Sequence, residues 1–160
     1  MDLSYIYELQ SNSLLFFSVS CNILIGVIPL SFCNLSSLKY LDLADNSLYG
    51  KVPQCLGNST TIWFLDLRMN NFHGIIPQTF SNGCQLKTMN LNGNQLDGSL
   101  PPSLVNCGNM EVLDVENNMI NDTFTHWLAT LPQLQVLILR SNRLYGPLGN
   151  SRTRFHFFNL

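Results

Sequence analysis

The chain is built on one pattern, seen in full in LKTMNLNGNQLDGSLP, residues 86–101. Apolar residues stand eight, five and three places before Asn94, and an apolar residue, a glycine and a proline follow it at two, four and seven places. An asparagine returns at the same point every 24 residues, at Asn22, Asn46, Asn70, Asn94, Asn118 and Asn142. Strict periodicity of this length predicts a stack of like structural units, each contacting only its neighbours.

The positions around the asparagine keep their character from copy to copy. The apolar triplets before it are Leu14/Phe17/Val19, Leu38/Leu41/Leu43, Ile62/Leu65/Leu67, Leu86/Met89/Leu91, Met110/Leu113/Val115 and Leu134/Leu137/Leu139. The glycines and prolines after it are Gly26, Gly50, Gly74, Gly98 and Gly146, and Pro29, Pro53, Pro77 and Pro101. The pattern is L-x-x-L-x-L-x-x-N-x-L-x-G-x-I-P, a leucine-rich repeat, whose period lies between about 20 and 29 residues.

Each position of this repeat has a physical reason. In L-x-L a period of two places both leucines on one face of a short strand, and stacking the repeats joins the strands into a parallel sheet over one core. Where the chain leaves the strand its backbone groups still need hydrogen bonds, and an asparagine side chain can serve neighbouring turns. Glycine suits a positive φ or a close approach, and proline suits an extended segment. These residues are therefore assigned to the scaffold.

We predict a fold of the α/β repeat class: a right-handed leucine-rich-repeat solenoid of six 24-residue repeats, forming a single array over residues 1–160. A parallel β-sheet should line the concave face, and the convex side should be irregular, 3-10 helical or extended. The strands should be centred near Phe17, Leu41, Leu65, Met89, Leu113 and Leu137, with the residues two, four and six places before each asparagine exposed. Phe155 and Phe158 begin a repeat that stops before its strand, so we expect an array truncated and uncapped at both ends.

Residues 84–148 carry a more specific resemblance. Their runs resemble the later repeats of plant receptor-like proteins, in the group that contains the Verticillium-wilt and leaf-mould resistance receptors. The runs are CQLK (84–87), NLNGN (90–94), SLVNC (103–107), NNMINDTF (117–124) and LILRSNR (137–143). Thr125 departs from the proline usual at its position.

This resemblance implies the C-terminal half of the extracellular part of a type I membrane glycoprotein. Such proteins have one membrane helix, a short cytosolic tail and no kinase domain. They lie at the plasma membrane, detect microbial or developmental ligands on the extracellular side, and signal through partner receptor kinases. Membrane attachment would come only through a C-terminal helix that this sequence lacks.

The composition argues against several other classes. Hydrophobic residues make up 46% and charged residues 11%, and a net charge of −2 gives no support to nucleic-acid binding. No apolar run approaches the roughly 18 residues of a membrane span, and no basic segment marks a signal peptide. His73, His126 and His156 show no metal-ligand spacing, and no G-x-S-x-G elbow or phosphate loop occurs. We expect no enzyme, no cofactor and no metal.

Binding residues are sought among the positions that the scaffold does not use. The middle strand position gives an acidic column, Asp42, Asp66 and Asp114 with Asn90, spaced roughly 4.8 Å apart between strands. The full set of concave-face candidates is Tyr40, Asp42, Trp63, Phe64, Asp66, Arg68, Asn90, Glu111, Asp114, Glu116 and Arg140. Exposed aromatic residues beside an arginine are typical of interface hot spots. Two simpler interpretations stay open: aspartate is common at this position of the motif, and Trp63 could fold over the edge of the core.

These features predict a binding segment that recognises a protein, peptide or glycan ligand. One alternative is a soluble inhibitor of a pathogen cell-wall hydrolase, of the polygalacturonase-inhibitor type, built on the same plant repeat. The other is a gene fragment with no activity of its own.

The cysteine spacing predicts two disulfides. Cys33 and Cys55 lie 22 residues apart and Cys84 and Cys107 lie 23 apart, each close to one turn, so each pair should share a flank of adjacent turns. Cys21 would then stay unpaired. Reduced, buried cysteines are the alternative.

Three N-x-[ST] sequons occur outside the asparagine register, at Asn34, Asn58 and Asn121. A glycan must project into water, so we expect all three to be glycosylated on the convex or lateral side, with the register asparagines bare. The measurement is expression in a secretory host, glycosidase digestion and mass spectrometry. Unmodified asparagine at both Asn34 and Asn58 would contradict an extracellular location.

Overall fold

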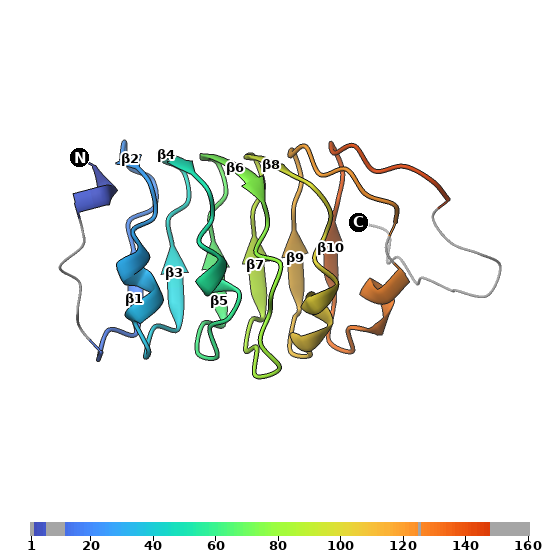
Figure 1. The fold of residues 1–160 in the computed structure, drawn as a ribbon, viewed down its shortest axis with the longest axis horizontal. Helices are drawn as coiled ribbons and strands as arrows, with labels where there is room; N and C mark the ends of the chain where they lie inside the picture. The colour runs from blue at the N-terminus through green and yellow to red at the C-terminus, as the bar shows by residue number, and fades with distance from the viewer. Residues whose placement is uncertain (1, 6–11, 125, 148–160) are drawn as a thin grey trace.

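A six-stranded parallel sheet runs the length of the molecule in the computed structural model, which describes residues 2–5, 12–124 and 126–147 (Figure 1). Its strands, in spatial order, are β1 Phe16–Ser18, β3 Tyr40–Asp42, β5 Phe64–Asp66, β7 Thr88–Asn90, β9 Val112–Asp114 and β10 Val136–Ile138. Every strand pairs with the strand one repeat away, and their central residues are the six that the pattern predicted. The solenoid prediction is confirmed for the described residues, and the incomplete repeat at Phe155 and Phe158 lies outside them.

A second, shorter parallel sheet forms where the chain leaves the first. Its strands are β2 Ile25–Gly26, β4 Ser47–Gly50, β6 Asn71–Ile75 and β8 Gln95–Asp97. We had predicted only irregular, 3-10 or extended structure away from the main sheet. The second sheet forms because extended segments of successive turns lie side by side, with partners 22 residues apart such as Ile25 and Ser47, so that their N–H and C=O groups can pair.

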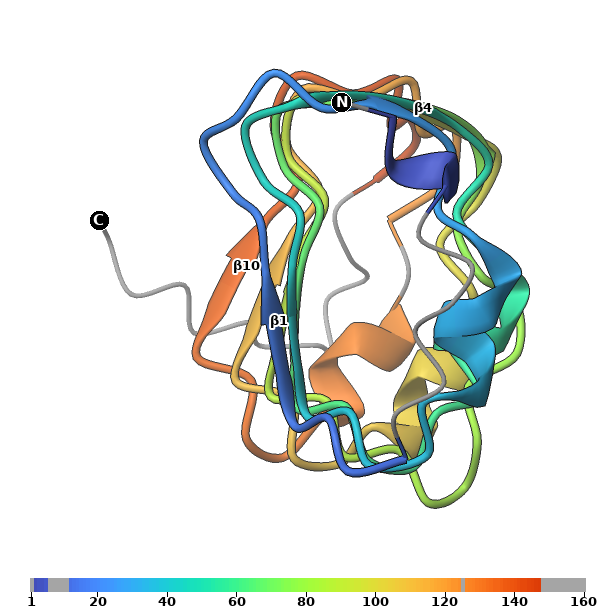
Figure 2. The ribbon, with the colours of Figure 1, turned by 90° about the vertical axis from the view of Figure 1, so that its left-hand side faces the viewer.

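Five 3-10 helices stand among the described residues: η1 Leu3–Tyr5, η2 Leu30–Asn34, η3 Gln54–Leu56, η4 Pro102–Asn106 and η5 His126–Thr130. Figure 2 shows η2 to η5 on the side opposite the six-stranded sheet. Pro29, Pro53 and Pro101 directly precede three of these helices, in extended or near-extended conformation. The repeat's proline therefore ends the extended segment and sets where the helix begins.

The leucines of the pattern form one continuous core between the sheet and the helices. Leu41, Leu65, Met89 and Leu113, at the centres of the inner strands, are fully or almost fully buried. At the ends of the stack, Leu14, Phe17, Leu134 and Leu137 are only half-buried, because each lacks a described turn on one side. A fully buried leucine stabilises a fold by about 1.5–3 kcal/mol, so repetition of this contact supplies most of the stability.

The register asparagines join each turn to the one before it, and we call them the asparagine ladder. Asn46 is typical: its Oδ1 accepts the N–H of Leu24 at 2.9 Å, and its Nδ2 donates to the carbonyl of Val19 at 3.0 Å, both in the preceding turn. The same Nδ2 also donates to the carbonyls of Leu43 and Ala44 in its own turn. Asn70, Asn94, Asn118 and Asn142 repeat this arrangement.

The residue before each ladder asparagine has a positive φ, which the sequence pattern did not indicate. The six residues are Cys21, Asp45, Met69, Gly93, Asn117 and Ser141, with φ between 52° and 68°. A non-glycine residue pays a steric cost there, and in five of these residues the N–H donates to a carbonyl of the following turn. Only one of the six is glycine, so their residue types give no common signal.

We expect Asn70→Ala to lower the free energy of unfolding by about 2–4 kcal/mol, because it leaves the buried N–H of Leu48 without its acceptor and removes one of the two amide donors to the carbonyl of Leu43. Asn22→Ala is the matched control, since Asn22 is exposed and bonds carbonyls of its own turn. Urea unfolding of the two variants beside the wild type measures the difference. Equal losses would contradict the structural role assigned to the ladder.

Candidate ligand-binding surface

The outer side of the six-stranded sheet, here called the sheet face, carries every candidate binding residue of the sequence analysis. Tyr40, Asp42, Trp63, Phe64, Asp66 and Arg68 lie on or beside β3 and β5, in its N-terminal half. Asn90 lies on β7 in the middle, and Glu111, Asp114, Glu116 and Arg140 lie on or beside β9 and β10. The in-register pairing lines these side chains up in columns across the strands.

The acidic column is held by hydrogen bonds to its own backbone. The Oδ1 atoms of Asp42, Asp66 and Asp114 accept the N–H two residues later, at 3.1, 3.0 and 2.9 Å, and Oδ1 of Asn90 does the same at 3.1 Å. Each side chain thus closes an Asx turn as the chain leaves the strand. This explains why aspartate and asparagine both occupy the position, and why adjacent carboxylates are tolerated.

The prediction that the residues two, four and six places before each asparagine are exposed is wrong at four positions. Ala44, Asp66, Asp114 and Glu116 are buried, with 1%, 4%, 8% and 7% of their surface exposed. The Asx turn draws the aspartate side chains toward the backbone, and longer neighbours cover them. Glu116 lies under a network in which Arg140 Nε, Asn92 Nδ2 and Asn117 Nδ2 all donate to its carboxylate.

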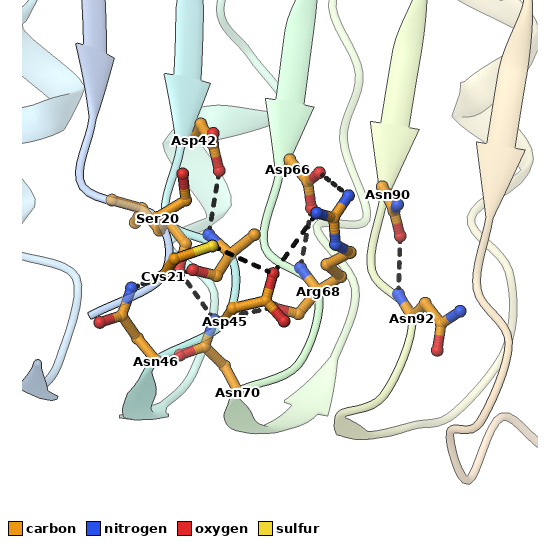
Figure 3. Close-up of polar contacts among 12 residues, drawn as sticks. Ser20, Cys21, Asp42, Asp45, Asn46, Asp66, Arg68, Asn70, Asn90 and Asn92 are labelled. Atoms are coloured by element: carbon orange, nitrogen blue, oxygen red, sulfur yellow. Dashed lines mark hydrogen bonds and ion pairs between the residues drawn. The ribbon is translucent and has the colours of Figure 1, made fainter. Parts of the chain in front are cut away.

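Arg68 joins two carboxylates of neighbouring turns. Its guanidinium lies 2.9 Å from Asp66 Oδ2 and 3.4 Å from Asp45 Oδ2, and Figure 3 shows it between the two. Burial raises the pKa of Asp66, while the backbone N–H and the charge of Arg68 hold it down and the charges of Asp42 and Asp45 raise it further. The pKa of Arg68 is raised, first of all by Asp66, so the guanidinium stays charged.

Four aromatic rings form a continuous strip at the start of the strands, which we call the aromatic strip: Phe16, Tyr40, Trp63 and Phe64. The Tyr40 and Phe64 rings stack with centroids 4.2 Å apart, and Phe16 extends the row with its centroid 5.7 Å from that of Tyr40. Trp63 packs edge-on against both Tyr40 and Phe64. Trp63 is half-buried and is not part of the hydrophobic core, so it belongs to the surface.

Phe16 was missed as a candidate, although its position in the repeat is that of Tyr40 and Phe64. It is 58% exposed.

Burial raises the pKa of Tyr40, with smaller contributions from Asp42 and Asp66, so its hydroxyl stays protonated at neutral pH and can donate a hydrogen bond.

The C-terminal half of the sheet face is charged instead of aromatic. Lys87 Nζ lies 3.1 Å from Glu111 Oε1, and Arg140, whose side chain is 76% exposed, pairs with the buried Glu116. Asp114 Oδ2 accepts from Asn92 Nδ2 at 3.3 Å. The two halves of the face therefore offer different chemistry to a partner.

The disulfide cysteines and the sequons lie away from the sheet face, whereas Cys21 lies beside it, with its Sγ donating to Asp45 Oδ2 at 3.9 Å (Figure 3). Disulfides join Cys33 to Cys55 and Cys84 to Cys107, the pairs that the spacing predicted, with Cα atoms 5.6 and 4.8 Å apart, and Cys21 is exposed and unpaired. Asn34 at the end of η2 and Asn58 just after η3 are exposed on the helical side, and Asn121 is also exposed. All three could carry a glycan without covering the sheet.

Among the described residues, no group of three or more histidine, cysteine, aspartate and glutamate side chains is placed to hold a metal ion. In the same residues no helix has the length and apolar character needed to cross a membrane.

Comparison with known families identifies the repeat. The leucine-rich repeat family matches residues 37–59, 64–120 and 85–144, which together cover more than half of the chain. The chain belongs to the leucine-rich repeat family. No curated protein matches the sequence.

Solved structures of similar shape are ectodomains of plant receptors. One is the receptor kinase GASSHO1/SCHENGEN3 of Arabidopsis thaliana in complex with CASPARIAN STRIP INTEGRITY FACTOR 2, with TM-score 0.77, 30% identity, and coverage of 83% of this chain and 16% of that one. Another is the Arabidopsis receptor kinase HAESA with the peptide hormone IDA and the co-receptor SERK1, with TM-score 0.70, 25% identity, and coverage of 83% and 26%.

The ectodomain of the Arabidopsis thaliana receptor kinase SOBIR1 is shorter. It matches with TM-score 0.71 and 31% identity, over 82% of this chain and 72% of that one. The chain thus resembles a plant leucine-rich-repeat ectodomain, and it spans about a sixth to a quarter of the length of the GASSHO1/SCHENGEN3 and HAESA chains.

We expect Arg68→Met to destabilise the fold by about 1–2 kcal/mol at neutral pH, because it removes the cation beside the buried Asp66. The figure is below that for a fully buried pair, since the guanidinium is half-exposed. Without Arg68 the pKa of Asp66 rises further, and a protonated Asp66 needs no cation. The stability difference from the wild type should therefore shrink as pH falls through the raised pKa of Asp66.

Urea unfolding at several pH values measures this difference, with Lys87→Met as control, because Lys87 pairs with an exposed part of Glu111. A loss that is independent of pH would show that Arg68 acts through packing and not through charge.

Proposed function

We propose that this chain is a ligand-recognition segment of a plant cell-surface receptor-like protein, and that it binds a peptide across its sheet face without catalysis. The observation that carries the proposal is the aromatic strip. Phe16, Tyr40, Trp63 and Phe64 lie outside the core, so folding does not require large apolar rings at these four positions. Surface aromatic residues next to charged side chains have the composition of binding hot spots.

The similar ectodomains support a peptide as the ligand. HAESA is described in complex with the peptide hormone IDA and the co-receptor SERK1, and GASSHO1/SCHENGEN3 in complex with CASPARIAN STRIP INTEGRITY FACTOR 2. The flat, ordered strands of the sheet face offer side chains in columns, which suits an extended chain lying across several turns. By the same comparison we propose a co-receptor kinase as the second partner.

The finer features of the proposal come from the resemblance of residues 84–148 to disease-resistance receptor-like proteins. We propose an extracellular location at the plasma membrane, glycans on Asn34, Asn58 and Asn121, and a role in defence or developmental signalling. A complete receptor would carry its membrane helix outside the residues of this chain.

A peptide-display selection on the immobilised chain tests the proposal. We expect selected peptides to lose most of their binding to Trp63→Ala and Glu111→Lys, which alter the sheet face. They should keep it with Tyr49→Ala and Asp97→Lys, because both residues are exposed on the second sheet. The change on the sheet face should be on the order of tenfold or more, as for the loss of a hot-spot aromatic residue.

The same protein should leave a fungal polygalacturonase active. Slowing of that enzyme by the chain would favour the hydrolase-inhibitor function instead. Failure to select any peptide that depends on the sheet face would contradict the proposal itself.

A further inference from the structure

We infer that the N-terminal half of the sheet face binds a part of its peptide ligand in which a lysine or arginine side chain lies beside an apolar one. This inference rests on the proposed function and specifies the ligand chemistry at one end of the surface. Its two parts are the carboxylate of Asp42 and the aromatic strip.

Asp42 is the aspartate of the column that remains open to a ligand. Its Oδ1 is engaged in the Asx turn, and its Oδ2 accepts only from the hydroxyl of Ser18, at 3.2 Å, among the described residues. Asp66 has Arg68, and Asp114 is buried with Asn92. Asp42 is half-exposed, and no ion pair reaches it in the described part of the chain.

The surroundings of Asp42 leave room for a cation. Ala44 lies two residues after Asp42, in the neighbouring column. The following turns have Arg68, Asn92, Glu116 and Arg140 at this position, whereas the short side chain of Ala44 does not reach over the carboxylate of Asp42. The charged groups nearby are Lys39, at the start of the same strand, and Asp45, Asp66 and Arg68. Arg68 is held by Asp66 and Asp45, and Figure 3 shows it turned away from Asp42.

The charges of this region favour a cation. Three carboxylates, Asp42, Asp45 and Asp66, face two cations, Lys39 and Arg68, which leaves one negative charge in excess. The raised pKa of Tyr40, to which Asp42 and Asp66 contribute, reports the same negative field at the aromatic strip. An incoming ammonium or guanidinium group would restore the balance and gain from the ring of Tyr40 as well.

The aromatic strip supplies the apolar contact beside this site. Tyr40 and Asp42 are alternate residues of β3, on the same face and about 6.6 Å apart along the strand. A lysine or arginine side chain of a peptide that crosses the strands can bridge this distance, so it can reach Asp42 while a neighbouring apolar side chain packs on Tyr40, Phe16 and Phe64. Tyr40 and Phe64 are nearly parallel, with 2° between their planes, so they cover each other's faces. Their outward edges suit aliphatic or aromatic side chains better than the flat stacking of a sugar.

The test uses a charge-only substitution. Asp42→Asn should leave the fold intact, because Asn90 occupies the equivalent position and its Oδ1 makes the same backbone hydrogen bond. Asp97→Asn is the matched control, because Asp97 is exposed on the second sheet, away from the sheet face. Thermal unfolding establishes that both variants are as stable as the wild type.

The probe is a positional-scanning library of N-acetylated, C-amidated octapeptides, bound to the full chain and to each variant. We expect enrichment of lysine or arginine next to an apolar residue. Single peptides from the enriched pool should bind Asp42→Asn about tenfold more weakly, and their affinity for it should depend less on salt. Asp97→Asn should bind them like the wild type, and Phe64→Ala should lose the apolar preference while keeping the basic one.

The outcomes separate this inference from the proposed function. Peptides that bind the sheet face with no basic residue, or that bind Asp42→Asn as well as the wild type, overturn the inference and leave the proposed function standing. A library from which no peptide is retained by the sheet face overturns both.

Discussion

Each ladder asparagine from Asn46 to Asn142 hydrogen bonds the backbone of two successive turns, and the arrangement of the sheet face follows from this. A short strand of three residues makes few ladder hydrogen bonds, so pairing alone would hold its register weakly. The asparagine fixes that register by hydrogen bonds to both turns. Asn70 Oδ1 accepts the N–H of Leu48, and Asn70 Nδ2 donates to the carbonyls of Leu43 and Leu67. Because these groups are buried, an offset of one residue would leave them unpaired at a large cost.

Fixed register converts the repeat into columns of outward side chains. A residue type at one position of the motif then meets its equivalent in the next turn at the spacing of adjacent strands, as Tyr40 meets Phe64 and Asp42 meets Asp66. What a column can bind still depends on local partners. Asp42 and Asp66 occupy equivalent positions, yet their partners differ. Arg68 donates to the carboxylate of Asp66, whereas among the described residues Asp42 Oδ2 accepts only from the hydroxyl of Ser18.

The periodicity of the sequence was sufficient for the main sheet, because the leucine triplets and the asparagines each obey a local rule that repeats. It could not give the second sheet, because its strands depend on pairing between turns and because the residues between the recurring apolar residue and the glycine, such as Tyr49 and His73, share no type. It also could not give the positive φ before each asparagine, since Cys21, Asp45 and Met69 have nothing in common but their place. The candidate residues were placed on the correct face from their spacing. Their burial was not predictable, because it depends on side chains one turn away, such as Arg140 over Glu116.

Charge is distributed unevenly around the solenoid, and this bears on which side meets a partner. The stretches that form the helical side, residues 30–37, 54–62, 78–85, 102–110 and 126–135, contain no aspartate, glutamate, lysine or arginine. A surface of that kind would be poorly solvated on its own, and two of the three sequons, Asn34 and Asn58, lie on it. Glycans there would supply the solvation that charge does not.

Most of the charged residues lie instead on or beside the sheet face, where they pair with one another or stand beside the aromatic strip. An uncharged helical side and a charged, aromatic sheet face therefore differ in their surface chemistry. The disulfides fit this division, because Cys33–Cys55 and Cys84–Cys107 join neighbouring turns on the helical side, and neither crosses the sheet face. The same backbone repeat thus carries covalent cross-links on one side and, on the other, columns of side chains whose polarity differs from turn to turn.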